Sequence, residues 1–228
     1  MCIRDRYFTI TSGISFSLKP IGFVCESTTI QTAKTDRYHP RVDAESERIA
    51  ALAATRFHEC GITGTGVDAL SRAAGVSKRT LYERFGSKEG LVVAAYKSLD
   101  LPVYRMFTGA IDAQLDDPRT QLEAFFAQLE PILTSPDFRG CPFTNAASEL
   151  PDPNHPAHAV VRRHKARLRR WLRDKARVAG ASDPDQLSRD LMLVFAGAQT
   201  QALIQGSGRA PARDARRLAT TLIESAVR

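Results

Sequence analysis

The sequence predicts an all-α protein in which an N-terminal head of three short helices joins a larger helical bundle. Three observations lead to this prediction. Apolar residues recur at three- and four-residue steps from Val42 onward, which is the period of one buried helix face. Glycine and proline divide this pattern into segments of helical length. Residues 101–228 contain no alternating apolar and polar run of the kind that indicates a strand.

The composition of the 228 residues is that of an ordinary globular chain, with 43% hydrophobic and 25% charged residues. No apolar run approaches the roughly 18 residues that a membrane-spanning helix needs, so we expect no membrane partner. The net charge of +7 is compatible with nucleic acid or another anionic partner. Because no two cysteines have Cys-x-x-Cys spacing, we expect a cytoplasmic protein with reduced thiols and without a cofactor. The four cysteines are Cys2, Cys25, Cys60 and Cys141.

Residues 1–40 differ from the rest of the chain in their pattern of apolar and polar residues. They show neither the helical nor the strand period, and the apolar stretch 16–24 is too interrupted for a signal peptide. The opening residues 1–6 resemble the translated read-through of a sequencing adaptor. A genuine flexible arm is the alternative interpretation. We therefore expect a disordered or non-native leader over residues 1–40 and leave it out of the fold argument.

The first helix of the head follows Val42 and has one apolar face. Gly61 ends it, as a C-cap glycine does. Thr65 and Asp68 form a Thr-x-x-Asp variant of the capping box, which predicts the start of a second, short helix. Gly75 ends that helix and permits a left-handed backbone in the turn that follows.

Two more helices follow this turn. Ser77 caps a short helix over residues 78–85, and Ser87 caps a longer helix that starts at Lys88. Two short helices joined by a turn that contains glycine form the helix-turn-helix pattern. The exposed face of its second helix carries cations and hydroxyls that suit phosphates and base edges. These residues are Lys78, Arg79, Thr80, Tyr82 and Arg84. The alternative is a small three-helix bundle with a solvated charged face.

The string from Leu70 to Leu91 is far more specific than the helix-turn-helix pattern alone. Its Ala-Gly-Val-Ser at 74–77, Thr-Leu-Tyr at 80–82 and Phe-x-Ser-Lys-Glu at 85–89 resemble the DNA-binding domain of the TetR family of transcriptional regulators. The string departs from the family pattern at Ser71, where alanine is usual, and at Arg84, where histidine is common. The resemblance covers residues 43–100 closely and the rest of the chain loosely.

The resemblance implies a homodimer that binds a two-fold symmetric DNA operator with one recognition helix per subunit. It implies a helix-turn-helix DNA-binding domain over residues 41–88 and a ligand-binding and dimerisation domain over residues 89–228. By position in the motif, three side chains would meet bases and four would meet phosphates. The base contacts would be Lys78, Arg79 and Thr80. The phosphate contacts would be Thr65, Tyr82, Arg84 and Lys88.

The rest of the chain is also helical by period. We expect the helix that starts at Lys88 to continue past Pro102 with a kink or an interruption, and the helix that follows Pro118 to bend at Pro131. Further helices are expected over residues 141–150, 157–178, 183–205 and 212–227. In the TetR family the last two helices usually form a dimer interface, and the small residues around Gly197 would permit close contact. By pattern alone these two helices fit internal core equally well.

The body is where such a regulator would hold a small-molecule effector. Residues 139–150 resemble a segment that lies between the pocket helices in a subset of these regulators. Apolar side chains that could line a cavity are Phe107, Phe125, Phe126, Leu129, Cys141, Phe143, Trp171 and Phe195. Polar side chains that could orient a ligand are Asn145, His164 and Gln199. Alternatively, each aromatic residue belongs to the hydrophobic core and lines no pocket.

Other functions have weaker support. His155, His158 and His164 are close in sequence but badly spaced for a shared metal ion, so we expect none. Cys141 at the start of a short helix could sense oxidants or electrophiles. No catalytic constellation is present, so we expect no enzyme.

The sequence thus favours a ligand-responsive repressor that a small molecule releases from its operator. One alternative is a regulator that acts through Cys141. The other is a helical module or enzyme that does not bind DNA.

Overall fold

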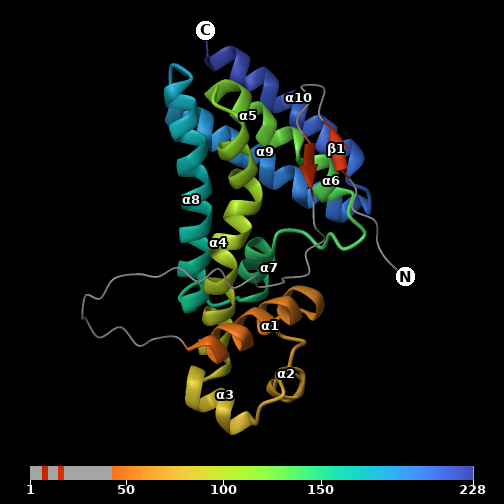
Figure 1. Cartoon of the computed structure of the whole chain (residues 1–228), viewed down its shortest axis with the longest axis vertical. Coiled ribbons are helices and arrows are strands. Elements are labelled where there is room, and N and C mark those ends of the chain that lie inside the picture. The colour runs from red at the N-terminus through yellow and green to blue at the C-terminus, as the bar shows by residue number, and fades with distance from the viewer. Residues whose placement is uncertain (1–6, 10–14, 18–42, 228) are drawn as a thin grey trace, which may run out of the picture.

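The computed structural model describes residues 7–9, 15–17 and 43–227. A small helical head lies at one end, and a single long helix connects it to a larger helical body (Figure 1). Over these described residues, no helix is long and apolar enough to cross a membrane. The predicted all-α architecture is confirmed from residue 43 onward.

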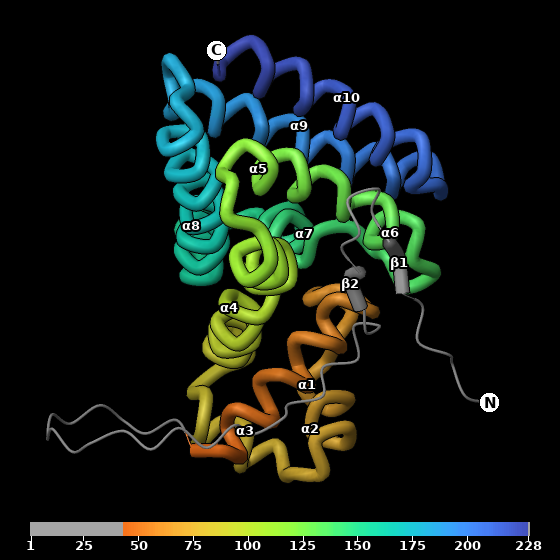
Figure 2. Tube along the Cα trace, turned by 45° about the horizontal axis from the view of Figure 1, so that its top comes forward, coloured from red at the N-terminus to blue at the C-terminus, as the bar shows by residue number. Residues whose placement is uncertain are grey.

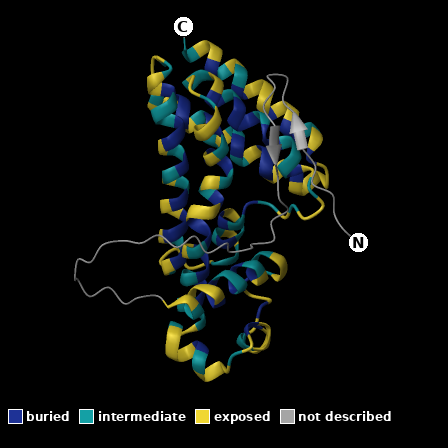
Figure 3. Cartoon of the chain, in the orientation of Figure 1, coloured by how far each residue is buried: buried dark blue, intermediate teal, exposed yellow. Residues whose placement is uncertain are grey.

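The head contains α1 (Ala44–Cys60), α2 (Val67–Ala74) and α3 (Lys78–Phe85). The predicted caps are largely confirmed, because the Ser77 side chain accepts a hydrogen bond from the backbone N–H of Thr80 at the start of α3. Gly75 ends α2 in the left-handed conformation with φ of 68°. A small apolar core holds the three helices together (Figure 3). Its largest fully buried members are Ile49, Phe57, Leu70 and Leu91.

The predicted capping box at the start of α2 is wrong. The N-cap residue is Gly66, which has no side chain to cap the helix. The hydroxyl of Thr65 instead donates to the carbonyl oxygen of Gly61 at 2.6 Å, so it closes the turn between α1 and α2. The interaction within the turn competes with the cap for the same hydroxyl.

The connecting helix α4 (Lys88–Gln114) runs for 27 residues and passes Pro102 without interruption. Pro102 lies on an exposed part of α4, where water can solvate the carbonyl group that loses its helical partner. The apolar side of α4 packs first on α1 in the head and then on α8 in the body (Figure 2). The helix therefore belongs to both parts of the molecule.

The body consists of α5 (Pro118–Ala127), α6 (Leu129–Leu133), α7 (Pro142–Glu149), α8 (Pro156–Val178), α9 (Pro184–Gln205) and α10 (Arg209–Ala226). Four of these helices start at proline, which is favoured at the first helical position because its missing N–H has no helical partner there. The predicted bend at Pro131 is instead a break between α5 and α6 at Gln128. The Gln128 side chain donates to the carbonyl oxygen of Phe107 at 2.7 Å.

The last two helices pack on each other at the end of the body far from the head (Figure 1). Their inner residues are core, since Leu191, Phe195 and Ile223 are fully buried. Two short strands, β1 (Tyr7–Thr9) and β2 (Ser15–Ser17), pair antiparallel with Phe8 opposite Phe16. The sequence pattern did not predict this pair, and the rest of the leader over residues 1–40 lies outside the described residues.

Candidate nucleic-acid interface

The recognition surface is built on α3, whose two faces differ sharply. Leu81 points inward and is only 3% exposed. Tyr82 is 48% exposed, and the side chain of Arg79 is 87% exposed. Gly75 allows the tight turn that sets α3 against α2. The helix therefore presents cations and a phenol outward while one leucine anchors it.

Two of the predicted base contacts form ion pairs on this surface. The Lys78 ammonium pairs with the Asp68 carboxylate of α2, and Arg79 Nε donates to Glu83 Oε1 at 2.7 Å within α3. Each of these side chains is more than half exposed. Ion pairs in such positions contribute little stability, so both cations can exchange a carboxylate for a nucleic-acid group. The third predicted base contact, Thr80, shares a hydrogen bond of 2.8 Å with the Ser77 hydroxyl.

Arg84 has an intramolecular partner that the sequence did not indicate. Its Nη1 donates to Asp43 Oδ1 at 2.6 Å and to the Ser46 hydroxyl at 3.0 Å, so it ties the end of α3 to the start of α1. The hydrogen bond from Arg84, together with that from the Ser46 amide, lowers the pKa of Asp43 from 3.8 to about 2. A phosphate that takes Nη1 of Arg84 must compete with this carboxylate.

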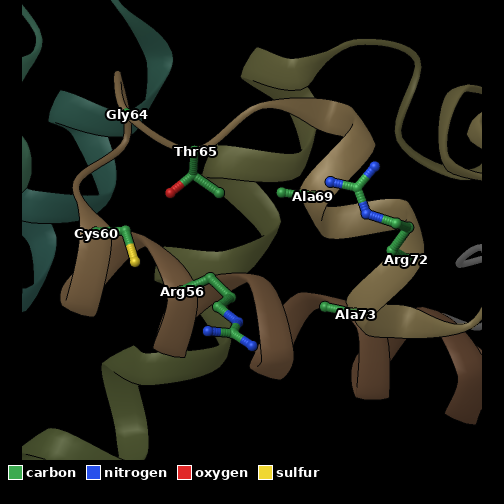
Figure 4. Close-up of a pocket in the computed structure, with 7 residues that line it drawn as sticks. All are labelled: Arg56, Cys60, Gly64, Thr65, Ala69, Arg72 and Ala73. Carbon is green, nitrogen blue, oxygen red and sulfur yellow. The ribbon is translucent and has the colours of Figure 1, made fainter.

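Thr65 also differs from its predicted role. The residue is 5% exposed, and its hydroxyl already donates a hydrogen bond to the Gly61 carbonyl oxygen. Thr65 lies at the edge of a hollow of about 450 Å³ between α1 and α2 (Figure 4). The two guanidinium groups of Arg56 and Arg72 line the same hollow. The sequence pattern did not identify either arginine as a possible anion contact, although Arg72 belongs to the basic stretch before α3.

Lys88 and Tyr82 complete the predicted surface. Lys88 is the first residue of α4 and follows Ser87, whose side chain accepts from the Gly90 amide at 3.0 Å. This cap fixes the start of α4 beside the end of α3. The structure thus brings five of the seven predicted DNA contacts to α3 and one to the start of α4. Thr65, the seventh, lies in the turn before α2.

The predicted ligand-binding aromatics pack against one another in the centre of the body. Phe107 and Phe195 have ring centroids 5.0 Å apart, and Phe125 lies 5.2 Å from both Phe126 and Phe195. Leu129 is fully buried, and Trp171 stacks obliquely on Phe125 at 5.7 Å. The packing supports the alternative given by the sequence, in which these residues are core.

His164 sits in a buried polar cluster. Its Nδ1 lies 3.0 Å from Asp100 Oδ1, and its ring stacks on Phe143 at 3.7 Å. The same aspartate pairs with Arg163 at 3.4 Å and with Arg167 at 3.2 Å. Burial lowers the pKa of His164, while the hydrogen bond to Asp100 opposes this shift. Sequence reasoning missed Asp100, because only the fold brings α4 beside α8.

The remaining polar candidates lie near the start of α7 and on α9. The Lys165 ammonium is 3.3 Å from Cys141 Sγ, and Asn145 Nδ2 donates to the carbonyl oxygen of Arg139 at 2.8 Å. Gln199 is 6% exposed, and its Oε1 has no hydrogen-bond partner among the described residues. A buried acceptor without a partner is costly, so Gln199 is the candidate most suited to receive a donor from a ligand.

The three histidines that could have shared a metal ion have separate partners. His155 Nδ1 accepts from the Ala157 amide at 3.1 Å, and His158 Nε2 lies 2.9 Å from the Leu150 carbonyl oxygen. His164 faces Asp100 in the core, as described above. Within residues 7–9, 15–17 and 43–227, no three histidine, cysteine or acidic side chains gather as a possible metal site.

An exposed basic helix of a helix-turn-helix head, joined to a helical body, defines a DNA-binding transcriptional regulator. Two family models agree with this class. Residues 49–95 match the model described as bacterial regulatory proteins of the tetR family, and residues 118–218 match the tetracyclin repressor-like C-terminal domain. The chain belongs to the TetR family of transcriptional regulators.

Of three relatives, one is a TetR-type regulator, one is an HTH-type transcriptional regulator and one shares the fold. A TetR-type transcriptional regulator from Streptomyces avermitilis is 37% identical, with a TM-score of 0.72 over 81% of this chain and 98% of that one. The transcriptional regulator YjdC of Escherichia coli is 24% identical over 73% of this chain and 86% of its own length. The reduced form of NemR from E. coli shares the fold, with a TM-score of 0.70 and 20% identity over 79% of this chain and 98% of that one.

Arg84→Ala is expected to raise the pKa of Asp43 from about 2 toward 3.8, because the hydrogen bond from Arg84 is the largest cause of the depression. NMR titration of the Asp43 carboxyl carbon measures this directly. The depressed pKa makes the pair stabilising above pH 3.8, and the contribution is lost as the pH falls toward 2. Arg79→Ala, which removes the other arginine pair of α3, should leave this titration unchanged. An Asp43 titration midpoint that is the same with and without Arg84 would contradict the hydrogen bond between the two side chains.

Proposed function

We propose that this regulator binds a two-fold symmetric operator as a homodimer, inserting α3 of each subunit into the major groove, and that a small molecule bound in the body lowers its DNA affinity. The observation that carries the proposal is the outward face of α3. Arg79 and Tyr82 are exposed there, while Leu81 anchors the opposite face. In this mechanism the free protein represses transcription, and effector binding shifts the population toward a form that releases the operator.

The cations of the surface divide by position into two roles. Lys78 and Arg79 lie in the first turn of α3, where a recognition helix meets base edges. Lys88 lies at the start of α4, outside the recognition helix, and suits a phosphate. Tyr82 suits a phosphate as well. Arg84 joins the phosphate contacts once DNA displaces Asp43, and Thr65 contributes after the turn before α2 opens its bond to Gly61.

Arg79→Ala is expected to weaken binding to the preferred operator by ~1–3 kcal/mol and to relax the preference for one base pair. Lys88→Ala should weaken binding to all duplexes and reduce the slope of log affinity against log salt by about one unit. Both expected effects follow from the difference between a side chain that reads a base and one that neutralises a phosphate. Fluorescence anisotropy with specific and scrambled duplexes over a salt series measures both effects.

Arg177→Ala is the matched control, because Arg177 is an exposed arginine of α8, in the body. It should leave both affinity and salt dependence unchanged. If Arg79→Ala and Lys88→Ala produced the same loss on both duplexes, the division into base and phosphate contacts would be wrong.

The proposed dimer interface uses the outer face of α9. Leu193 is 72% exposed and Ile204 is 71% exposed, and the two lie about three helical turns apart on one side of the helix. Gly197 lies between them, and no described residue occupies the space where its side chain would be. Leu218 of the neighbouring α10 is also exposed. Apolar side chains that flank a glycine permit a second helix to approach closely, which supports pairing with a second copy.

Leu193→Glu is expected to convert the dimer into a monomer, because the carboxylate would be buried against its symmetry mate without a partner. Analytical ultracentrifugation at about micromolar concentration measures the change. Val178→Glu is the control, since Val178 is 69% exposed but lies on α8. A Leu193→Glu variant that stays dimeric would move the interface elsewhere on the surface.

The effector would enter the body beside Gln199, whose buried Oε1 has no partner among the described residues. Because the aromatic rings of the body pack closely, the effector must displace some of them, which links binding to a change in the body. A compound that releases the operator from the wild type is expected to have a much weaker effect on Gln199→Leu, while operator affinity without the compound stays unchanged. Equal release from both proteins would exclude Gln199 as the ligand contact.

A further inference from the structure

A side chain of the body bonds directly to the helix-turn-helix head. Glu149, the last residue of α7, points its carboxylate at the turn between α1 and α2. Its Oε2 accepts from the backbone N–H of Ile62 at 2.6 Å and from that of Thr63 at 3.3 Å. Hydrogen bonds from amides to a carboxylate are among the stronger ones in proteins. The contact spans 87 residues of sequence, and so it depends entirely on the fold.

The turn is shaped to receive this carboxylate. Gly61 has φ of 78°, and a Cβ added there would lie 2.9 Å from Glu149 Oε2. A side chain at position 61 would therefore both strain the backbone and push Glu149 away. The absence of a side chain on Gly61 gives the carboxylate room to reach the two amides that follow.

The opposite end of α7 is fixed in the core of the body. Phe143 is fully buried, stacks on His164 of α8 at 3.7 Å and meets the Tyr96 ring of α4 at 5.9 Å. Cys141, just before α7, lies 3.3 Å from Lys165 of α8. The eight-residue helix α7 is thus held by the body at both ends, since His158 Nε2 also contacts the Leu150 carbonyl oxygen, and by the head at its last residue.

Movement of the turn would pass directly to the DNA-binding surface. The turn leads through Thr65 into α2, and α2 packs on α3 through the apolar core that contains Leu70 and Leu81. The chain of contacts therefore runs from α7 through Glu149 and the turn to α2, and from there to α3. It runs beside α4, the covalent connection between head and body, which α7 also contacts through Phe143 and Tyr96.

We propose that Glu149 is a positioning residue that transmits the position of α7 to the helix-turn-helix, as a second connection beside α4. The effect of Glu149 on operator affinity rests on the proposed function, whereas the contact between Glu149 and the α1–α2 turn does not. A change in the core around Phe143 shifts α7, and Glu149 carries that shift to the amides of Ile62 and Thr63. Without the carboxylate, the direct contact between α7 and the head is lost, and only the route through α4 remains.

The test is a double-mutant cycle with the full chain, made of the wild type, Phe143→Leu, Glu149→Ala and the double variant. Phe143→Leu reduces the packing against His164 while keeping an apolar side chain. When Glu149 is present, Phe143→Leu is expected to change operator affinity by about three- to tenfold. In the Glu149→Ala background, the same substitution is expected to change it by less than about twofold. Anisotropy with the operator duplex gives the four dissociation constants. The same factor in both backgrounds, or no change in either, would overturn the proposal.

Amide hydrogen exchange supplies a second readout that does not need DNA. Glu149→Ala should speed exchange at Ile62 and Thr63 by about tenfold or more, since both amides lose a charged acceptor. Phe143→Leu should speed exchange over residues 62–74 only while Glu149 is present. If no variant bound DNA, the proposed function would fail, and exchange would still decide whether the link exists. Equal exchange at Ile62 and Thr63 with and without Glu149 would overturn the link.

Two variants control for loss of folding. Ser148→Ala removes the neighbouring side chain, whose hydroxyl donates to the carbonyl oxygen of Thr144 within α7. It should leave affinity and exchange as in the wild type. Glu149→Gln keeps one acceptor oxygen and is expected to give effects between those of wild type and Glu149→Ala. A Ser148→Ala variant that behaved like Glu149→Ala would show that any change at the end of α7 has this effect, and would overturn the specific role of the carboxylate.

Discussion

The DNA-binding surface depends on the anchoring of α3, a helix of eight residues that would not be stable alone. Leu81 inserts into the head core, and Arg84 bonds to Asp43 at the start of α1. These two contacts fix the inner face and the far end of the helix, while Ser77 caps its start. Because α3 is held by its neighbours, any shift of those neighbours changes the direction in which Arg79 and Tyr82 point. A regulator built in this way can be controlled from outside its recognition helix.

Local features of the sequence were enough to predict most of the helices. Ser77 and Ser87 cap α3 and α4 as their positions indicated, and Gly61 and Gly75 end α1 and α2. Such signals act over three or four residues, so they are visible in the chain itself. Pro102 was harder to interpret, because a proline on an exposed stretch of a long helix can be accommodated by water. The same limit applies at Gln128, where a long-range hydrogen bond accompanies a break that no local residue indicates.

The interactions that depend on tertiary structure were not predictable. Arg84 looked like a free phosphate contact, yet its partner Asp43 lies 41 residues earlier in the sequence. Asp100 and Glu149 gave no signal as single acidic residues on amphipathic helices, and the fold alone places them beside His164 and the α1–α2 turn. The aromatic residues of the body matched a core pattern first and a pocket pattern second. Their mutual packing decides for core in the structure described, so an effector site requires a change of that packing.

The most direct test of the account is selection from a random duplex library by the purified full chain at a stated salt concentration. Two copies of α3, related by the axis of a homodimer, predict enrichment of a two-fold symmetric sequence with half-sites about one helical turn apart. Enrichment of a single half-site would contradict the dimeric arrangement. A folded dimer that enriched no sequence at all would contradict the central claim that the exposed face of α3 reads DNA.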